Sequence, residues 1–196
     1  MLSLIIDTST KFLYLAIVNH NQIIATKCHE GMKNHAGMSV YLIDAMLKEN
    51  NYSVDDIKAI YCGVGPGSYT GVRISVTIAK MLASFKGIPL YKVSSLFLAS
   101  SGYTAKNIAV TFDARRGNVF SLCYGENYLE DKLRNKEDFI LQVKDFNDII
   151  FVTEEDFKVD PIRVIENGVL VNEVDAFVPN YLRIPEAEYN LLHKND

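Results

Sequence analysis

The chain has 196 residues and a formal net charge of −4, and 48% of its residues are hydrophobic while 22% are charged. This composition excludes a globally disordered, collagen-like or low-complexity chain, because it supplies enough apolar surface to build a core. No apolar stretch approaches the roughly 20 residues that a bilayer span needs, so we expect no membrane span. The three cysteines lie in apolar runs and are expected to be thiols in a reducing cytoplasm.

The charge is unevenly distributed. Residues 1–102 hold nine Lys and Arg against six Asp and Glu, whereas residues 103–196 hold eleven against eighteen. An acidic second half is a poor surface for phosphate backbones, so we expect no direct contact with nucleic acid. Three widely spaced cysteines form neither a disulfide framework nor zinc-ligand pairs, and buried thiols are expected.

The first half predicts alternating strands and helices. Residues 2–7, 12–18 and 22–29 read as an antiparallel meander. A helix is predicted from about Ala36 to Asn50, a strand over 57–63, a helix from about Thr70 to Lys86 that Gly87 ends, and a strand over 88–93. Ser94 and Ser95 then cap a short helix that runs to about Ser101.

The opening pattern recurs in the second half. Residues 108–125 align with residues 2–19 at an offset of 106 positions, and this alignment pairs Asp113 with Asp7. We expect a duplicated βββαβαβα unit with a reduced second copy, which is the architecture of the actin-like ATPase and sugar-kinase (ASKHA) fold. The expected domains are 1–102 and 103–196. Residues 126–160 look irregular and without good helices, and 162–171 and 174–183 are read as strands.

A glycine-rich loop over Gly63–Arg73 follows a strand and opens a helix. Its free N–H groups at the helix N-terminus could hold an anion, and Ser68 or Thr70 could cap the helix. The alternative is a tight, well-capped turn without a ligand. The loop is no Walker A motif, because Gly-Lys-Ser/Thr is missing.

The two Asp-ended turns also allow two interpretations. Asp7 either orients a water or metal beside a phosphate or caps its own turn. Arg115 and Arg116 either clamp a phosphate or carboxylate, or form a solvated turn that pairs with Asp113.

The helices at 36–50 and 70–86 carry more apolar surface than one sheet would cover. We expect this surplus to form a subunit interface, the alternative being that the helices pack on each other. The expected interface residues are Met38, Leu42, Ala45, Met46, Val72, Val76, Ala79 and Ala83.

No metal site is expected. His35 precedes the first of these helices, but position 39 is Ser39 rather than a second ligand, and a single His is no zinc site.

Four segments spread over the chain make it similar to a known family. They are Ile6–Thr10, the loop GPGSYTGVR (65–73), the turn DARRGNVF (113–120) and the end PNYLRIPEAE (179–188). The chain resembles the bacterial TsaB (YeaZ) family, which is needed for threonylcarbamoyladenosine modification of tRNA.

The resemblance implies the ASKHA fold and an accessory role. The TsaD-type partner of this family carries a His-x-x-x-His metal site and transfers threonylcarbamoyl to N6 of adenosine 37 in tRNAs that read ANN codons. A TsaE-type ATPase joins them, and TsaB-like proteins form homodimers through the N-terminal helices. The resemblance implies no cofactor of the chain's own, ATP or ADP only within the assembly, and tRNA only through the complex.

The resemblance leaves one group of residues as a possible phosphate-binding or interface site. They are Asp7, Thr8, Ser9, Gly65, Gly67, Ser68, Thr70, Gly71, Arg73, Asp113, Arg115 and Arg116. Two alternative functions stay open: an autonomous nucleotide-dependent phosphotransferase or ATPase with Asp7 and Asp113 at the phosphates, and a metallopeptidase, against which the lone His35 argues.

Overall fold

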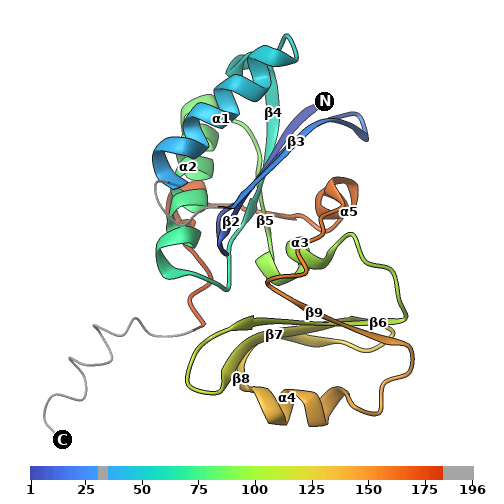
Figure 1. Ribbon diagram of the computed structural model, residues 1–196. Coiled ribbons are helices and arrows are strands. Elements are labelled where there is room, and N and C mark those ends of the chain that lie inside the picture. Colours follow the sequence, from blue (N-terminus) through green and yellow to red (C-terminus); the bar gives the residue numbers. More distant parts are fainter. Residues whose placement is uncertain (31–34, 183–196) are drawn as a thin grey trace, which may run out of the picture.

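The computed structural model describes residues 1–30 and 35–182, which form two lobes, each built on one β-sheet (Figure 1). The first lobe contains a six-stranded sheet in the order β10-β5-β4-β1-β2-β3, and the second a four-stranded sheet in the order β8-β7-β6-β9. The strands are β1 (Leu2–Asp7), β2 (Phe12–Asn19), β3 (Gln22–Glu30), β4 (Ile57–Gly63), β5 (Leu90–Val93), β6 (Asn107–Asp113), β7 (Asn118–Gly125), β8 (Leu129–Asn135), β9 (Ile149–Thr153) and β10 (Val169–Leu170).

The first sheet is buried on both faces. β1 pairs antiparallel with β2 and parallel with β4. Because side chains alternate along a strand, Leu4 and Ile6 enter the core beneath helices α1 (His35–Glu49) and α2 (Tyr69–Lys86), while Ile5 enters a second core on the opposite face. This double burial explains why LSLIID is an almost continuous apolar run rather than an alternating one.

The ends of α2 follow from its sequence. The Ser68 hydroxyl accepts a hydrogen bond from the Gly71 N–H, which caps the first turn. Gly87 ends the helix in the left-handed conformation, at φ 62°. The predicted start and stop of this helix are confirmed to within one residue.

The second sheet repeats the topology of the first. β6 pairs antiparallel with β7 and parallel with β9, as β1 does with β2 and β4. Asp113 ends β6 as Asp7 ends β1. The repeated arrangement confirms the doubled unit that the 106-residue offset predicted.

The expectation that residues 126–160 are irregular is wrong. They contain β8, helix α4 (Lys136–Val143) and β9. The many charges of β8 suit an edge strand that is wet on one face. Asn135 caps α4 by accepting hydrogen bonds from the Glu137 and Asp138 N–H groups, and Phe139 and Val143, four residues apart, dock the helix on the sheet.

The strands expected over 162–171 and 174–183 are also wrong. Pro161 begins the short helix α5 (Pro161–Glu166), which Asp160 caps, so an apolar run that looked extended is helical. Of the residues in these two ranges that the structure describes, only Val169–Leu170 pair as a strand. A 3₁₀ turn, η2, follows at Val174–Ala176, and a similar turn, η1 (Val54–Asp56), precedes β4.

The chain crosses back to the first lobe near its end. β10 pairs with β5, and Phe177 enters the core beneath α1 and α2. The helix α3 (Ser95–Ser100) lies between the two sheets, with Leu98 in the first lobe's core and Leu96 and Ala99 in the second lobe's core. The division at residue 102 stays a prediction.

Within the described residues, no helix is long and apolar enough to cross a membrane.

Candidate functional site

The Gly63–Arg73 loop lies directly on the turn after β1. The Ser68 N–H donates to the Ser9 carbonyl at 2.6 Å, and the Gly65 N–H donates to the Ser95 hydroxyl at 2.8 Å. The Thr8 hydroxyl donates to the Gly71 carbonyl at 2.6 Å. These backbone groups bond to the protein itself, which favours the capped-turn interpretation of the loop over a phosphate cradle.

Position 71 needs a glycine because the backbone of Thr8 lies so close to it, and not because the residue adopts a left-handed backbone conformation. A Cβ atom at this position would lie 2.0 Å from the Thr8 carbonyl oxygen. The Thr8 hydroxyl also accepts a hydrogen bond from the Ser75 N–H, one turn further along α2. The loop glycine therefore lets α2 begin in direct contact with the β1 turn.

Asp7 is fully buried beside this contact. Its carboxylate accepts hydrogen bonds from the Ser9 N–H at 2.9 Å, the Ser9 hydroxyl at 2.7 Å and the Ser95 hydroxyl at 2.5 Å. Burial raises the pKa of this carboxyl above its usual 3.8, against the opposing effect of these hydrogen bonds. Asp7 thus caps its own turn and ties it to α3, and it does not line an open cleft as a phosphate-orienting residue would.

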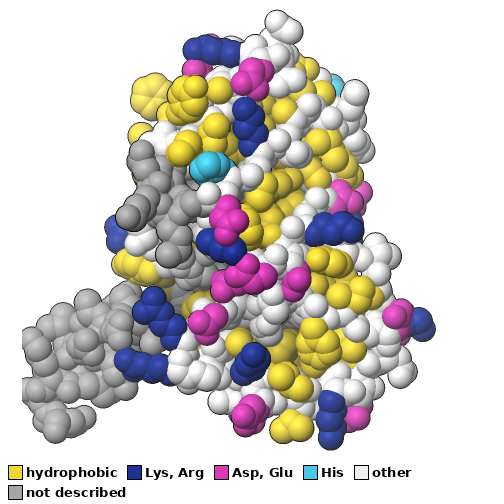
Figure 2. Space-filling model, viewed as in Figure 1, with side chains coloured by type: hydrophobic (Ala, Val, Ile, Leu, Met, Phe, Trp, Pro, Cys, Tyr) yellow, Lys and Arg dark blue, Asp and Glu magenta, His cyan; other side chains and the backbone are white. Residues whose placement is uncertain are grey.

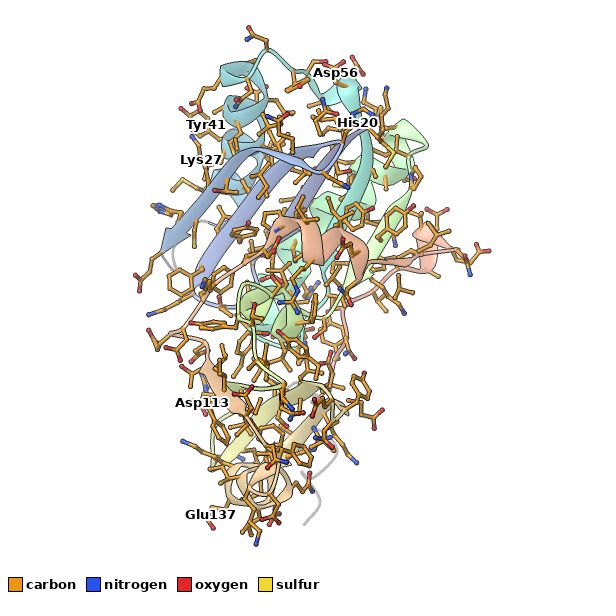
Figure 3. The ribbon with its side chains drawn as sticks, turned by 90° about the vertical axis from the view of Figure 1, so that its right-hand side faces the viewer. His20, Lys27, Tyr41, Asp56, Asp113 and Glu137 are labelled. Carbon is orange, nitrogen blue, oxygen red and sulfur yellow. The ribbon has the colours of Figure 1, made fainter. Side chains whose placement is uncertain are left out.

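The turn after β6, which corresponds to the turn after β1, differs from it because its side chains are exposed to solvent. Asp113, Arg115 and Arg116 are exposed, and the Asp113 carboxylate accepts a hydrogen bond from the Arg115 N–H at 2.8 Å. Asp113 lies at the end of the second lobe that is nearer the first, whereas Glu137 lies at the far end (Figure 3). Because Asp7 is enclosed, the two carboxylates do not both line an open cleft, as the phosphotransferase alternative with Asp7 and Asp113 at the phosphates would need.

Five of the eight predicted interface residues lie inside the protein's own core. Val72, Val76, Ala79, Ala83 and Met46 are each less than 5% exposed. This part of the interface prediction is wrong, since the surplus apolar surface of the two helices is largely used against the first sheet and against each other. Met38, Leu42 and Ala45 are half-buried.

Other apolar side chains of the same two helices are exposed instead. On α1, Val40 is 58% and Tyr41 68% exposed, and on α2, Met81 is 66% and Phe85 94% exposed. Figure 2 shows hydrophobic side chains at the surface of the first lobe, interspersed with charged ones. We call Val40, Tyr41, Met81 and Phe85 the exposed helix set. Helical periodicity correctly predicted that the two helices carry surplus apolar surface. It was wrong about α2, because the side expected to face a partner packs on the sheet and the opposite side, with Met81 and Phe85, is exposed.

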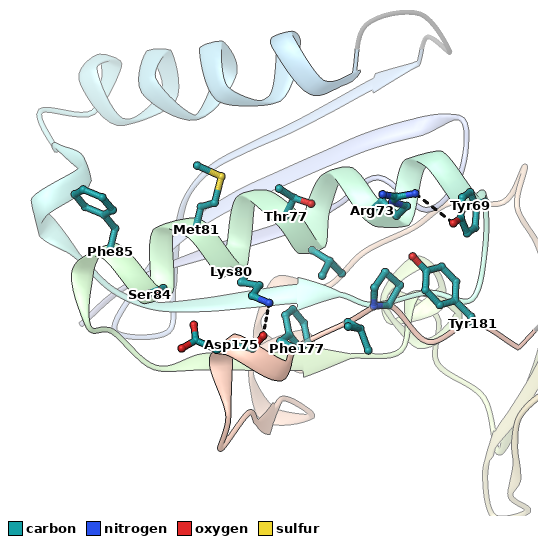
Figure 4. A pocket seen from close by; sticks show the side chains of 13 residues that line it. Tyr69, Arg73, Thr77, Lys80, Met81, Ser84, Phe85, Asp175, Phe177 and Tyr181 are labelled. Carbon is teal, nitrogen blue, oxygen red and sulfur yellow. Dashed lines mark hydrogen bonds between the residues drawn. The ribbon is translucent and has the colours of Figure 1, made fainter.

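Beside α2 lies a groove that the sequence analysis missed. It has a volume of about 590 Å³ and is bounded by α2 on one side and by residues 175–181 on the other (Figure 4). At one end, the Arg73 guanidinium lies over the Tyr69 ring, 5.3 Å from its centroid, and donates to the Tyr69 hydroxyl at 3.2 Å. The Tyr181 ring centroid lies 5.3 Å from that of Tyr69. Of the predicted loop residues, Ser68, Thr70 and Arg73 are the exposed ones.

In the part of the chain that the structure describes, no group of three or more His, Cys, Asp or Glu side chains is arranged to hold a metal ion. The side chain of His35 lies outside the described residues.

Comparison with known proteins identifies the family to which the chain belongs. Residues 15–140 match the family described as "TsaD: tRNA N6-adenosine threonylcarbamoyltransferase". The chain belongs to the TsaD family. Among curated proteins, the "tRNA threonylcarbamoyladenosine biosynthesis protein TsaB" of Bacillus subtilis is 40% identical over 126 residues, which are 63% of this chain and 55% of that protein. The Escherichia coli protein of the same name is 33% identical over 123 residues, 60% of this chain and 52% of that protein.

These TsaB relatives confirm the resemblance seen in the sequence, although the chain spans only about half the length of the curated relatives it matches. Among solved structures, YeaZ from Pseudomonas aeruginosa superposes with a TM-score of 0.71 at 22% identity, over 92% of this chain and 99% of that one. A second Pseudomonas aeruginosa structure, of a protein with similarity to peptidase YeaZ, gives a TM-score of 0.73 at 21% identity over 93% of this chain and 99% of that one. The fold expected from the repeat is thereby confirmed.

Proposed function

We propose that this chain is a non-catalytic subunit required to form N6-threonylcarbamoyladenosine at adenosine 37 of tRNAs that decode ANN codons. The observation that carries the proposal is the match of residues 15–140 to the TsaD family, together with relatives named as TsaB biosynthesis proteins. Two of the four segments that bear the family resemblance, Ile6–Thr10 and the loop at 65–73, contact each other where β1 meets α2.

The chemistry of these loops supports an accessory role. Asp7 is enclosed and fully hydrogen-bonded, and the loop N–H groups of Gly65 and Ser68 donate to Ser95 and Ser9 within the protein. The competing hypothesis, an autonomous phosphotransferase or ATPase of the same fold, needs these groups free. We therefore assign the chain no cofactor of its own, with ATP or ADP held only within an assembly.

The exposed helix set supports pairing with a TsaD-type catalytic subunit. Large apolar side chains open to water on two neighbouring helices are typical of a surface that a protein partner covers. In isolation, a second copy of this chain would cover the same side chains as a homodimer. A TsaE-type ATPase would join the pair, and tRNA would be contacted only through the assembly, in the cytoplasm.

A reconstitution assay tests this proposal. Threonylcarbamoyl incorporation into an ANN-decoding tRNA is measured with this chain alone, with the TsaD-type subunit and the TsaE-type ATPase alone, and with all three. We expect incorporation only when all three are present. Incorporation by this chain alone, or undiminished incorporation in its absence, contradicts the accessory role. Calorimetry of the isolated chain with millimolar ATP should show no binding heat.

A further inference from the structure

Two segments of the described chain carry it from one lobe to the other (Figure 1). The first crossing is residues 101–106, between α3 and β6, and the second crossing is residues 154–160, between β9 and α5. Lobes joined by such segments can swing when a few residues in them absorb changes in backbone torsion, as hinges do. The bonds that the crossings make decide whether they can act as hinges.

The backbones of the two crossings are hydrogen-bonded to each other. The Gly102 N–H donates to the Lys158 carbonyl at 2.9 Å, and the Lys158 N–H donates to the Ala99 carbonyl of α3 at 2.8 Å. A Cβ atom at Gly102 would lie 3.0 Å from the Lys158 carbonyl oxygen, so the two backbones are in direct contact. The crossings therefore form one doubled connection rather than two separate hinges.

A buried hydroxyl adds a side-chain bond between the crossings. Ser101 is fully buried, and its hydroxyl accepts a hydrogen bond from the Asp160 N–H at 2.8 Å and donates to the Leu98 carbonyl at 2.9 Å. The Asp160 carboxylate caps α5 by accepting hydrogen bonds from the Ile162 and Arg163 N–H groups. The end of α3 is thereby linked to the start of α5.

The Arg163 guanidinium binds the first crossing at two points. Its Nη1 atom donates to the Ser101 carbonyl and to the Tyr103 carbonyl, each at 2.6 Å. Within residues 1–30 and 35–182, no carboxylate forms an ion pair with this guanidinium. Hydrogen bonds from a charged donor are roughly twice as strong as those between neutral groups, so Arg163 makes the strongest side-chain contact with the crossing.

The two sides of this contact belong to different lobes. On α5, Val164 is fully buried in the first lobe's core, together with Ile5 of β1. Tyr103 packs instead against the second lobe's core, and its hydroxyl donates to the Asp156 carbonyl of the second crossing at 2.9 Å. The bond from Arg163 to the Tyr103 carbonyl therefore joins one lobe to the other.

Other contacts between the lobes restrain their angle less. Lys11 forms a surface ion pair with Glu155, and such pairs contribute little to stability. Ser94 and Asp131 share a single hydrogen bond. The helix α3 packs in both cores, but a shared helix leaves the lobes free to turn about its axis.

We propose that Arg163 locks the two lobes into one rigid body. While its guanidinium is in place, the crossings can change their torsions only by breaking two charged hydrogen bonds. Without it, the Ser101 and Tyr103 carbonyls lose their charged donor, and the crossings open while each lobe keeps its own core. This property belongs to the isolated chain and does not rest on the proposed function.

The distance between two spin labels, one on each lobe, tests the lock directly. One label is attached to Cys28, which is exposed on β3, and the other to Glu137→Cys, at the exposed far end of the second lobe (Figure 3), whereas Cys62 and Cys123 are buried. Double electron–electron resonance gives the distribution of this distance in the labelled parent protein, in Arg163→Met and in a control.

Arg134→Met is the matched control. The Nη1 atom of Arg134 also donates to two backbone carbonyls, those of Ser121 and Glu130, but both lie in the second lobe. We expect one narrow distribution in the parent and in the control, and a distribution at least twice as wide in Arg163→Met. A wide distribution in the parent, or one equally narrow in Arg163→Met, overturns the proposal.

Hydrogen exchange covers the case in which Arg163→Met lowers the stability of the whole chain. The N–H groups of Gly102 and Lys158 report on the crossings, and that of Ile60 reports on the first sheet. We expect the crossing groups in Arg163→Met to exchange at least tenfold faster, relative to Ile60, than in the parent, because they open without global unfolding. An unchanged ratio means that the whole chain is destabilised rather than the crossings, and it overturns the proposal.

Discussion

At the residue scale, two carboxyl groups at the contact between the lobes determine how stability changes with pH: Asp7 is buried and Asp131 is half-buried. Asp7 is enclosed by Ser9 and Ser95, and Asp131 of β8 accepts a hydrogen bond from the Ser94 hydroxyl at 2.9 Å. Burial raises the pKa of both, that of Asp131 to about 6. The stabilising contribution of such a group is fully present below its unfolded pKa of about 3.8 and is lost as the pH rises through its folded pKa.

We predict that Asp7→Asn reduces the loss of stability that accompanies rising pH. The amide keeps the size of the carboxyl group but has no charge to bury, so the free energy of unfolding of the variant falls less between pH 4 and pH 7 than that of the wild type. Urea denaturation at the two pH values measures this difference. An identical pH dependence in both proteins would show that Asp7 is ionised at no cost in the folded state.

Asp131→Asn tests the second carboxyl group. Because the pKa of Asp131 is raised to about 6, its effect on the free energy of unfolding should lie between about pH 4 and pH 6 and be constant above that range. The same denaturation series, extended to pH 8, checks it. A difference that keeps growing above pH 7 is inconsistent with this carboxyl as its source.

At the element scale, the start of α2 depends on a close approach to the β1 turn. We predict that Gly71→Ala destabilises the protein by about 2 kcal/mol or more, since its Cβ would meet the Thr8 carbonyl oxygen at 2.0 Å. Gly87→Ala is the matched control at the other end of the helix. Its Cβ meets no atom within 4 Å, so only the left-handed backbone conformation costs about 1 kcal/mol. Equal losses in urea denaturation would contradict the clash.

The buried side of α2 gives a second prediction at this scale. Ala79 is fully buried, so Ala79→Glu should destabilise the monomer by about 4 kcal/mol or more, because a charge is forced into the core. Thr77→Glu, on the exposed side of the same helix, should change stability by no more than about 0.5 kcal/mol. A stable, well-folded Ala79→Glu protein would instead place this residue at an interface.

These elements also show what the sequence could and could not predict. Caps and stop signals gave the ends of α2 correctly, because Ser68 and Gly87 act through their immediate neighbours. The side of α2 that meets the sheet depends on how the helix is rotated, and the spacing of its apolar residues does not determine that rotation. The helix α4 was missed because its core contribution is two residues, Phe139 and Val143, in a charged segment. The sequence could not predict the roles of Asp7 and of the Gly63–Arg73 loop, because Asp7 is bonded to Ser95 and the loop to Thr8, and both contacts join residues that are far apart in the sequence. It could not predict the groove beside α2, because residues 175–181 form one of its walls.

At the scale of the whole molecule, the two lobes are unequal copies of one unit. Within the described residues, the second sheet has the counterparts of β1 to β4 and of one helix, while the first sheet has two helices on its outer face and two further strands, β5 and β10. The more complete first lobe carries the loop at 65–73 and the exposed helix set. Our proposal therefore has the partner bind to the first lobe.

The most direct test of this account is tRNA modification by the reconstituted assembly with a variant of the exposed helix set. Met81→Glu with Phe85→Glu changes two side chains that are 66% and 94% exposed, so the monomer should fold as the wild type does, which circular dichroism and urea denaturation check. Phe151→Glu, at a 51% exposed position of β9 in the second lobe, is the matched control. We predict that the double variant loses at least tenfold in threonylcarbamoyl incorporation and no longer co-elutes with the TsaD-type subunit, while the control keeps both. Full incorporation and co-elution with the folded double variant would contradict the account.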